Sequence, residues 1–328
     1  MDYEKQIAGI LNGFQPATAL MTASGLGLFD ELKKPAAAPK IAKKLDLDPQ
    51  ASLRLLNVLT GMGIVAKEDD RFYLPEGWRK FLQRDGERYL GQWIALMADL
   101  QKAWMELPQY IGSGHNVTSV MDMLGGDPER MRAFIDAMHD KAVKATGMIA
   151  RAVPLGQARR MLDVGGGPGT YALEWARLHP ALQATVFDIA PVLEVARDYI
   201  RRYKLEDRVT TQTGDFNQGD LGTGYDLVLL ANVLHMYSAE MASALVARAA
   251  AALEPEGRLI IHGFATDEGG TSPLEDAIFS VNIGLLTEGG RAHPLAEMTG
   301  WVTSAGLAEA RSFRIDAIPT GVLTAVKP

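Results

Sequence analysis

Cysteine is absent from the 328 residues of this chain. Its absence excludes disulfide bonds, thiolate metal sites and a cysteine nucleophile, and it agrees with a reducing compartment. The sequence also lacks an uninterrupted apolar run long enough to cross a bilayer. Its opening sequence, MDYEKQIAG, contains acidic side chains and no apolar segment, so it does not resemble a signal peptide. These absences predict a cytoplasmic protein without a membrane partner.

Basic residues are also in short supply. The chain has 33 Lys and Arg against 40 Asp and Glu, which gives a formal net charge of −7. Nucleic-acid binding needs a basic face, so nucleic acid is not expected as the main partner. The 47% of hydrophobic and 22% of charged residues are ordinary for a globular protein. A chain of this length is too long for one small core and predicts more than one domain.

Residues 1–84 have apolar residues at helical spacing, followed by two strand-like runs around an acidic tip within 64–74. Asp48-Pro49 is typical of a helix start. Helices followed by a two-stranded ribbon indicate a winged helix. The helix that would enter a DNA groove carries Arg54 as its only basic residue. Few phosphate contacts are available there, so packing against a partner subunit is favoured over DNA binding.

Residues 85–150 are predicted to be wholly helical. Two apolar stripes at helical spacing support this prediction, and glycine-containing turns interrupt them. We interpret this stretch as a helical linker, part of which caps a ligand pocket. The stripes consist of Trp93, Leu96, Leu100, Trp104 and Leu107, and of Met131, Phe134, Ile135, Met138 and Ala142.

Residues 151–328 alternate strand-like and helical segments, which is typical of a parallel sheet covered on both faces. Helical spacing is clear over 191–203 and 239–253. The predicted fold class is therefore α/β. The strand-like runs are 161–164, 184–188, 209–213, 227–230, 259–261 and 322–326.

The strongest local signal is the sequence DVGGGPG at residues 163–169, between a predicted strand and a predicted helix. Glycine there lets the backbone turn sharply and approach a ligand closely. A dinucleotide fingerprint needs glycine at the sixth position from Gly165, where this chain has Thr170. The P-loop motif is absent as well. Asp163, directly before the loop, instead suits a ligand that carries positive charge.

Acidic residues also follow the next two strands. Asp188 lies roughly 20 positions after the loop, where nucleotide-binding folds place a carboxylate for the ribose hydroxyls. It also suits a helix N-cap. Asp215 and Phe216 follow the third strand, where they can meet an adenine amino group and ring. The alternative for Asp215 is a solvated loop residue.

The segment DVGGGPGTYALEWARLHPALQATVFDIAPVLEVAR resembles the nucleotide-binding half of the plant-type, caffeate-like family of small-molecule O-methyltransferases. That family includes bacterial enzymes of antibiotic and pigment biosynthesis, that is, of secondary metabolism. The likeness covers nearly the whole chain, from Leu26-Gly27-Leu28-Phe29 to the late loop that begins at Gly289. It implies S-adenosyl-L-methionine as the cofactor, a Rossmann-like seven-stranded sheet and a homodimer built through the N-terminal winged helix.

The resemblance also implies roles for single residues. Gly165, Gly167, Asp188 and Asp215 would contact S-adenosylmethionine, and Met138 would lie near it. Asp163 and Phe216 complete the predicted cofactor site. The predicted domains are a winged-helix dimerisation domain over 1–84, a helical linker and cap over 85–150, and a methyltransferase domain over 151–328.

His235 follows the fourth strand, at the edge where open α/β sheets bind ligands. The resemblance implies that it is the catalytic base, which takes a proton from an acceptor hydroxyl. The family's supporting carboxylates are missing. Met236 stands in place of an Asp, His262 in place of a Glu, and Ala292-His293 where another Glu is frequent. His235 is therefore predicted to be a weaker base, suited to an acidic acceptor such as a quinol or an enolised polyketide.

Acceptor specificity is expected to come from the helical cap and from the segment after the fifth strand. A metal held by His235, His262 and His293 is an alternative that their irregular spacing disfavours, so no metal is predicted. No role is predicted for the remaining histidines, His115, His139 and His179, which are interpreted as loop or helix-surface residues. The acceptor-pocket candidates are Trp104, Met105, Met138, His262, Phe264, Phe279, Asn282, Ile283, Leu286 and His293.

The predicted function is methyl transfer from S-adenosylmethionine to an oxygen of a small aromatic, quinol or polyketide-like molecule. The altered residues around His235 support a second hypothesis. In that hypothesis the same scaffold methylates carbon, or uses bound S-adenosylmethionine for hydroxylation or ring formation without methyl transfer. A DNA-binding regulator that senses S-adenosylmethionine is a third and least favoured hypothesis.

Overall fold

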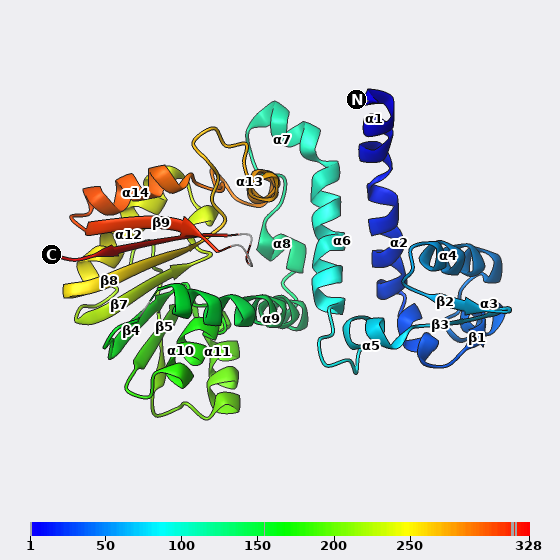
Figure 1. Cartoon of the computed structure of the whole chain (residues 1–328), viewed down its shortest axis with the longest axis horizontal. Helices are drawn as coiled ribbons and strands as arrows, with labels where there is room; N and C mark the ends of the chain where they lie inside the picture. Colours follow the sequence, from blue (N-terminus) through cyan, green and yellow to red (C-terminus); the bar gives the residue numbers. More distant parts are fainter. Residues whose placement is uncertain (1, 154, 316–317, 319) are drawn as a thin grey trace. The chain divides into compact units, whose positions relative to one another are not determined.

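The computed structural model describes residues 2–153, 155–315, 318 and 320–328. The chain forms two compact units, Met1–Lys102 and Ala103–Pro328, and Figure 1 labels most of their helices and strands. Residues 85–102 of the predicted linker belong to the first unit, and residues 103–150 belong to the second.

The first unit has the helices and hairpin predicted for a winged helix. Strands β2 (Ala66–Glu68) and β3 (Arg71–Tyr73) form the predicted antiparallel pair. Strand β1 (Ala36–Ala37) pairs with the other edge of β3, and the sequence does not reveal it because two alanines carry no alternation. The helices are α1 (Tyr3–Asn12), α2 (Phe14–Gly25), the 3-10 helix η1 (Leu28–Lys33), α3 (Ala38–Lys44), α4 (Pro49–Gly61) and α5 (Glu76–Leu82).

Local sequence accounts for the start of α4. The Asp48 carboxylate accepts the Ala51 N–H at 2.7 Å, and Pro49 occupies the first turn, where its missing N–H costs nothing. Leu56 and Leu59 on the inner face of the helix are fully buried in the core of the unit. Capping and burial together fix this helix, as Asp48-Pro49 predicts.

The centre of the second unit is a sheet that has seven strands within the described residues, in the order β6-β5-β4-β7-β8-β10-β9. Neighbours from β6 to β8 are parallel, and β10 is antiparallel to β8 and β9. The six predicted runs match strands, whereas the edge strand β9 is largely exposed and its sequence shows no apolar run. The strands are β4 (Arg160–Val164), β5 (Gln183–Asp188), β6 (Val209–Thr213), β7 (Tyr225–Ala231), β8 (Leu253–Gly263), β9 (Ala308–Arg314) and β10 (Gly321–Val326).

Successive residues of a strand point to opposite faces of this sheet, and both faces are buried by helices. In β7, Leu227 and Leu229 enter one core, whereas Val228 and Leu230 enter the other. Helices α10 and α11 cover the first face, with α9 packed against them, and α12 and α14 cover the second face (Figure 1). Burial on both faces explains why the strands are continuous apolar runs in the sequence.

Local sequence also accounts for the start of α9. Asp127 accepts the Glu129 N–H at 2.8 Å and caps the helix, and Pro128 occupies the first turn.

None of the described helices is both long and apolar enough to cross a bilayer. The helices outside the first unit's set are α6 (Gly91–Met105), α7 (Leu107–Ser113), α8 (Val120–Leu124), α9 (Pro128–Ala152), α10 (Thr170–Leu178), α11 (Ala190–Tyr203), the 3-10 helix η2 (Leu234–Met236), α12 (Ala239–Ala252), α13 (Leu274–Leu286) and α14 (Leu295–Ser304).

Candidate active site

The carboxyl ends of the parallel strands bring the predicted site residues to one edge of the sheet. Asp163 lies at the end of β4, Asp188 ends β5, Asp215 follows β6, and His235 in η2 follows β7. Because neighbouring parallel strands end at the same edge, residues far apart in the sequence meet there.

The glycine-rich loop between β4 and α10 has a conformation that requires glycine. Gly165, Gly167 and Gly169 have φ values of +65°, +58° and +77°, which is the left-handed region. A Cβ on Gly166 would lie 2.8 Å from the Asp163 carboxyl carbon. The loop backbone is thus held close to the Asp163 carboxylate and is unobstructed by side chains of its own.

The Asp163 carboxylate is buried, and no hydrogen bond of ordinary geometry reaches it from the described residues. Its exposed fraction is 0%, and neither oxygen has a partner among the described residues. Burial raises the pKa of Asp163 to about 7; the nearby Ala172 N–H partly offsets this rise, and the charge of Asp188 adds a smaller contribution to it. A buried acceptor without a donor is costly, so this carboxylate is suited to a cationic or hydrogen-bond-donating ligand.

Asp188 contacts the same loop. Its carboxylate accepts the Gly167 N–H at 2.9 Å and the Ile189 N–H at 2.7 Å. Burial raises the pKa of Asp188, and the two N–H donors partly offset that rise. The N-cap of α11 is Ile189, without a side-chain cap. The N-cap alternative for Asp188 is therefore wrong.

Phe216 lies at the other side of the loop. A Cβ on Gly165 would lie 3.5 Å from the Phe216 ring and 3.0 Å from the Val233 side chain. Asp215 is exposed and accepts the Asn217 N–H at 2.8 Å, so it also has the geometry of a solvated turn. Met138 is half-buried on α9, and its contact with the cofactor stays a prediction.

The His235 imidazole is buried and lies against two aromatic rings. Its side chain is 8% exposed, and its ring meets Phe279 edge-on at a centroid distance of 4.8 Å. Phe279 is stacked on Phe264 at 3.6 Å. Burial, with smaller effects of His293 and His262, lowers the pKa of His235 to about 3. Among the described residues, no hydrogen bond engages the His235 ring, so both nitrogens are available to a ligand.

His262 lines the same small cavity as His235, but its nitrogens are occupied. Nδ1 lies 2.9 Å from the Tyr171 hydroxyl, and Nε2 lies 2.7 Å from the Thr320 hydroxyl. Burial lowers the pKa of His262 to about 4. With both nitrogens engaged, His262 lacks a lone pair for a metal, and no metal-binding group of three or more ligands occurs among the described residues.

His293 also lines this cavity, and its Nε2 lies 3.2 Å from the Leu234 carbonyl and 3.0 Å from the Tyr237 carbonyl. These carbonyls flank His235 in the sequence. The Nδ1 atom is buried without a hydrogen bond, 3.7 Å from the Glu297 carboxylate. Burial and the charge of Arg291 lower the pKa of His293.

Most of the remaining acceptor candidates lie on α13. Phe279, Asn282, Ile283 and Leu286 recur at helical spacing and share a face. The Trp104 indole N–H donates to the Asn282 side-chain oxygen. Met105 differs, because its side chain is 75% exposed and the structure does not bring it to this cluster.

Sequence reasoning missed the environment of His139. The prediction that it is a loop or helix-surface residue is wrong, because it is buried and its Nδ1 lies 2.9 Å from the Thr170 hydroxyl at the start of α10. Its position four residues after Ile135, on the apolar stripe of α9, is the signal that indicates burial. Tyr171 and Thr320 were also missed, and nothing local in the sequence links them to His262.

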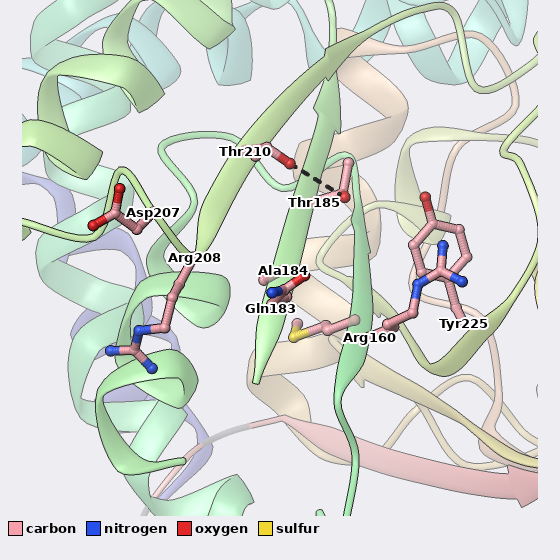
Figure 2. Close-up of a pocket in the computed structure, with 9 residues that line it drawn as sticks. Arg160, Gln183, Ala184, Thr185, Asp207, Arg208, Thr210 and Tyr225 are labelled. Atoms are coloured by element: carbon pink, nitrogen blue, oxygen red, sulfur yellow. Dashed lines mark hydrogen bonds between the residues drawn. The ribbon is translucent and has the colours of Figure 1, made fainter. Parts of the chain in front are cut away.

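A larger hollow lies elsewhere and does not belong to this site. Figure 2 shows it beside Arg160, Gln183 and Tyr225, each of which begins a strand, so it lies toward the amino ends of the sheet. Thr185 and Thr210 face each other there at 3.4 Å. Ligands of open α/β sheets bind at the opposite edge.

The neutral state of His235 is directly testable. We expect long-range ¹H–¹⁵N NMR to show a neutral His235 imidazole from pH 8 down to about pH 5, because burial disfavours its charged form. The histidines of the urea-unfolded protein should titrate near 6.5 and provide the control. Titration of folded His235 near that value would contradict the lowered pKa.

Comparison with known proteins agrees with this geometry. Residues 93–308 match an O-methyltransferase domain, and residues 8–79 match an O-methyltransferase dimerisation domain. A 3-hydroxy-5-methyl-1-naphthoate 3-O-methyltransferase of Streptomyces sahachiroi is 27% identical over 98% of this chain and 94% of its own. An L-tyrosine C(3)-methyltransferase of Streptomyces lavendulae is 29% identical over 98% of this chain and 92% of its own.

The solved structures include a close match to the whole chain. PigF, a methyltransferase of Serratia whose structure contains SAH, superposes with a TM-score of 0.91 at 27% identity, over 98% of this chain and 99% of PigF. The glycine loop, the unpartnered Asp163 carboxylate and Asp188 fit the S-adenosylmethionine that this family uses. The chain belongs to the O-methyltransferase family and is an S-adenosylmethionine-dependent enzyme that methylates oxygen.

Proposed function

We propose that this enzyme methylates an acidic hydroxyl on a small aromatic, quinol or polyketide-like molecule, with His235 as the base. The observation that carries the proposal is the buried His235 imidazole, without a carboxylate partner, beside the stacked rings of Phe264 and Phe279. Stacked aromatic side chains suit a flat ring. A base of low pKa suits a hydroxyl that loses its proton readily. We expect the reaction to take place in the cytoplasm.

The residues at the glycine loop fit the cofactor. S-adenosylmethionine, when bound, supplies a methyl group on a positively charged sulfur. The unpartnered Asp163 carboxylate would pair with a cationic part of that molecule, as buried charges require. Asp188 would accept the ribose hydroxyls. Phe216 would pack on the adenine ring, with Asp215 beside its amino group and Met138 near the cofactor.

His235 would act on the acceptor without the help of a second residue. In its neutral form a ring nitrogen would accept the proton of the acceptor hydroxyl and so raise the electron density on the oxygen that takes the methyl group. The resulting imidazolium would be buried, with no carboxylate in contact with it among the residues that the structure describes, which makes His235 a weak base. Asn282, Ile283, Leu286 and Trp104 would then set which rings fit, by shape and by the one amide.

We also propose that the protein acts as a homodimer through its N-terminal unit, of which residues 8–79 match the dimerisation domain. Helix α1 has no buried residue, and its apolar side chains Tyr3, Ile7, Ile10 and Leu11 are at least 57% exposed. An apolar surface of this kind is typical of a subunit interface. Sedimentation showing only monomer at micromolar concentration would rule the dimer out.

The acceptor class is tested with matched phenols and quinols that share one ring scaffold and differ in hydroxyl acidity. We expect kcat/KM to rise with the acidity of the hydroxyl, because transfer of its proton to a weak base then costs less free energy. Mass spectrometry counts the added methyl groups, and NMR of the product distinguishes an O-methyl from a C-methyl group. A C-methylated product, or a donor left unconsumed while an acceptor is altered, would favour the alternative chemistry on this scaffold.

A further inference from the structure

The late loop, residues 289–293, packs around the turn that carries His235. A Cβ on Gly290 would lie 2.6 Å from the His235 carbonyl oxygen and 2.6 Å from the Ile283 side chain. Gly289 has a φ of +76°, and a Cβ there would lie 3.2 Å from Ser238. Only glycine fits between α13 and η2 at position 290, so the loop backbone lies against the backbone of the turn.

His293 completes this contact. Its Nε2 lies within hydrogen-bond distance of the Leu234 and Tyr237 carbonyls, at 3.2 Å and 3.0 Å. Carbonyl oxygens only accept, so Nε2 carries the proton and donates to both. The ring is 1% exposed and packs edge-on against Trp301 at 4.9 Å. One imidazole therefore holds the turn on both sides of His235.

The same loop is fixed to the acceptor helix. The Ala292 N–H donates to the Ser280 hydroxyl at 3.2 Å, and the Thr266 hydroxyl donates to the Ala292 carbonyl at 3.2 Å. Ser280 lies on α13 directly after Phe279, whose ring contacts His235. Residue 292 thus acts through its backbone, which explains how alanine serves at this position.

We propose that His293 is a positioning residue, which holds the η2 backbone so that the His235 imidazole faces the acceptor. This role rests on the proposed function of His235 as the base. A carboxylate would orient such a base through its ring, whereas His293 orients it through the two carbonyls that flank it. A displacement of about 1 Å at a reacting group can cost on the order of 10²-fold in rate, so the two hydrogen bonds from His293 should affect kcat.

His293→Leu and His293→Gln separate positioning from simple packing. Leucine fills a similar space but has no hydrogen-bond donor. We expect kcat to fall about 10- to 100-fold, while the KM values for S-adenosylmethionine and for the acceptor stay within about twofold. Glutamine keeps an N–H donor and should recover most of the rate. Gly290→Ala should also lower kcat, because its Cβ would press on the His235 carbonyl.

Two control variants match these substitutions. His179 lies between α10 and β5, outside the site, so His179→Leu should leave kcat unchanged. A Cβ on Gly300 of α14 would meet nothing within 4 Å, so Gly300→Ala controls for Gly290→Ala. If His293→Leu does not fold, His293→Phe keeps the ring packing against Trp301 and takes its place.

The outcomes distinguish this proposal from the proposed function. An unchanged kcat in His293→Leu, with an inactive His235→Ala, overturns the positioning role and leaves His235 as the base. A fall in kcat that glutamine does not recover, together with a matching rise in both KM values, also overturns it and indicates a structural role. Full activity in His293→Leu and in His235→Ala removes the base and the positioning role together.

Discussion

Replacing His235 by alanine is expected to lower kcat about 10²- to 10⁴-fold, which is the usual contribution of a positioned general base. The affinity for S-adenosylmethionine should stay within about twofold, because the cofactor loop and Asp163 lie on other strands. Product formation by mass spectrometry gives kcat, and isothermal titration calorimetry gives the affinity. Added imidazole should restore part of the rate by occupying the space that the side chain leaves.

The size of this effect should depend on the acceptor. With an acidic hydroxyl that is already ionised at the assay pH, His235→Ala should lose less, because alignment then supplies most of the rate. His179→Ala, outside the site, is the control. Equal kcat in wild type and His235→Ala with every acceptor would sink the assignment of His235 as the base, although not the methyltransferase activity.

Replacing Asp163 by asparagine is expected to change stability and cofactor binding in opposite directions. Burial raises the pKa of this carboxyl to about 7 from 3.8, so its charged form costs on the order of 4 kcal/mol in the ligand-free fold. Asparagine removes that cost and should stabilise the ligand-free protein at pH 8. The lost charge pair should weaken S-adenosylmethionine binding by roughly 30- to 1,000-fold.

The raised pKa of Asp163 makes the free energy of unfolding depend on pH. Between about pH 4 and 7 the folded state keeps a proton on Asp163 that the unfolded state has released, so this group makes the free energy of unfolding fall as pH rises. The advantage of Asp163→Asn should therefore grow over that window and level off above it. Urea unfolding at several pH values measures it.

Asp226 provides the matched control for Asp163. Its carboxylate accepts the Arg159 and Arg160 N–H groups at 2.9 Å and 2.6 Å, so it is a paired, structural carboxylate. Asp226→Asn should destabilise the protein and leave S-adenosylmethionine affinity unchanged. A destabilised Asp163→Asn with normal affinity would show that Asp163 is structural as well, and would remove it from the cofactor site.

Much of the cofactor site is predictable from contiguous sequence. The left-handed φ values at Gly165 and Gly167 demand glycine, and the strand before them demands a buried apolar run, so both requirements appear in neighbouring letters. The same holds for the α4 start at Asp48-Pro49 and for six strands of the sheet. Strand β9 is missed because an exposed edge strand needs no apolar pattern.

The acceptor side of the site depends on contacts between distant segments. His262 meets Tyr171 and Thr320 across 91 and 58 residues, and His293 meets the turn of His235 across 59 and 56. A histidine that donates to carbonyls has no distinguishing neighbours in the sequence, because any residue has a carbonyl to offer. Position 293 was therefore predicted to be a pocket residue, and its clamp on the turn was not foreseen.

The sequence by itself determined the α/β fold and the winged-helix segment, because both rest on local backbone requirements and on burial periodicity, and its resemblance to a known family over contiguous motifs implied the family and the cofactor. The tertiary structure decided which imidazole is left free for a ligand. Both ring nitrogens of His262 hydrogen-bond to hydroxyls, and Nε2 of His293 donates to two carbonyls. Neither nitrogen of His235 has a hydrogen bond within the described residues. Packing makes that distinction, because the three side chains are chemically identical.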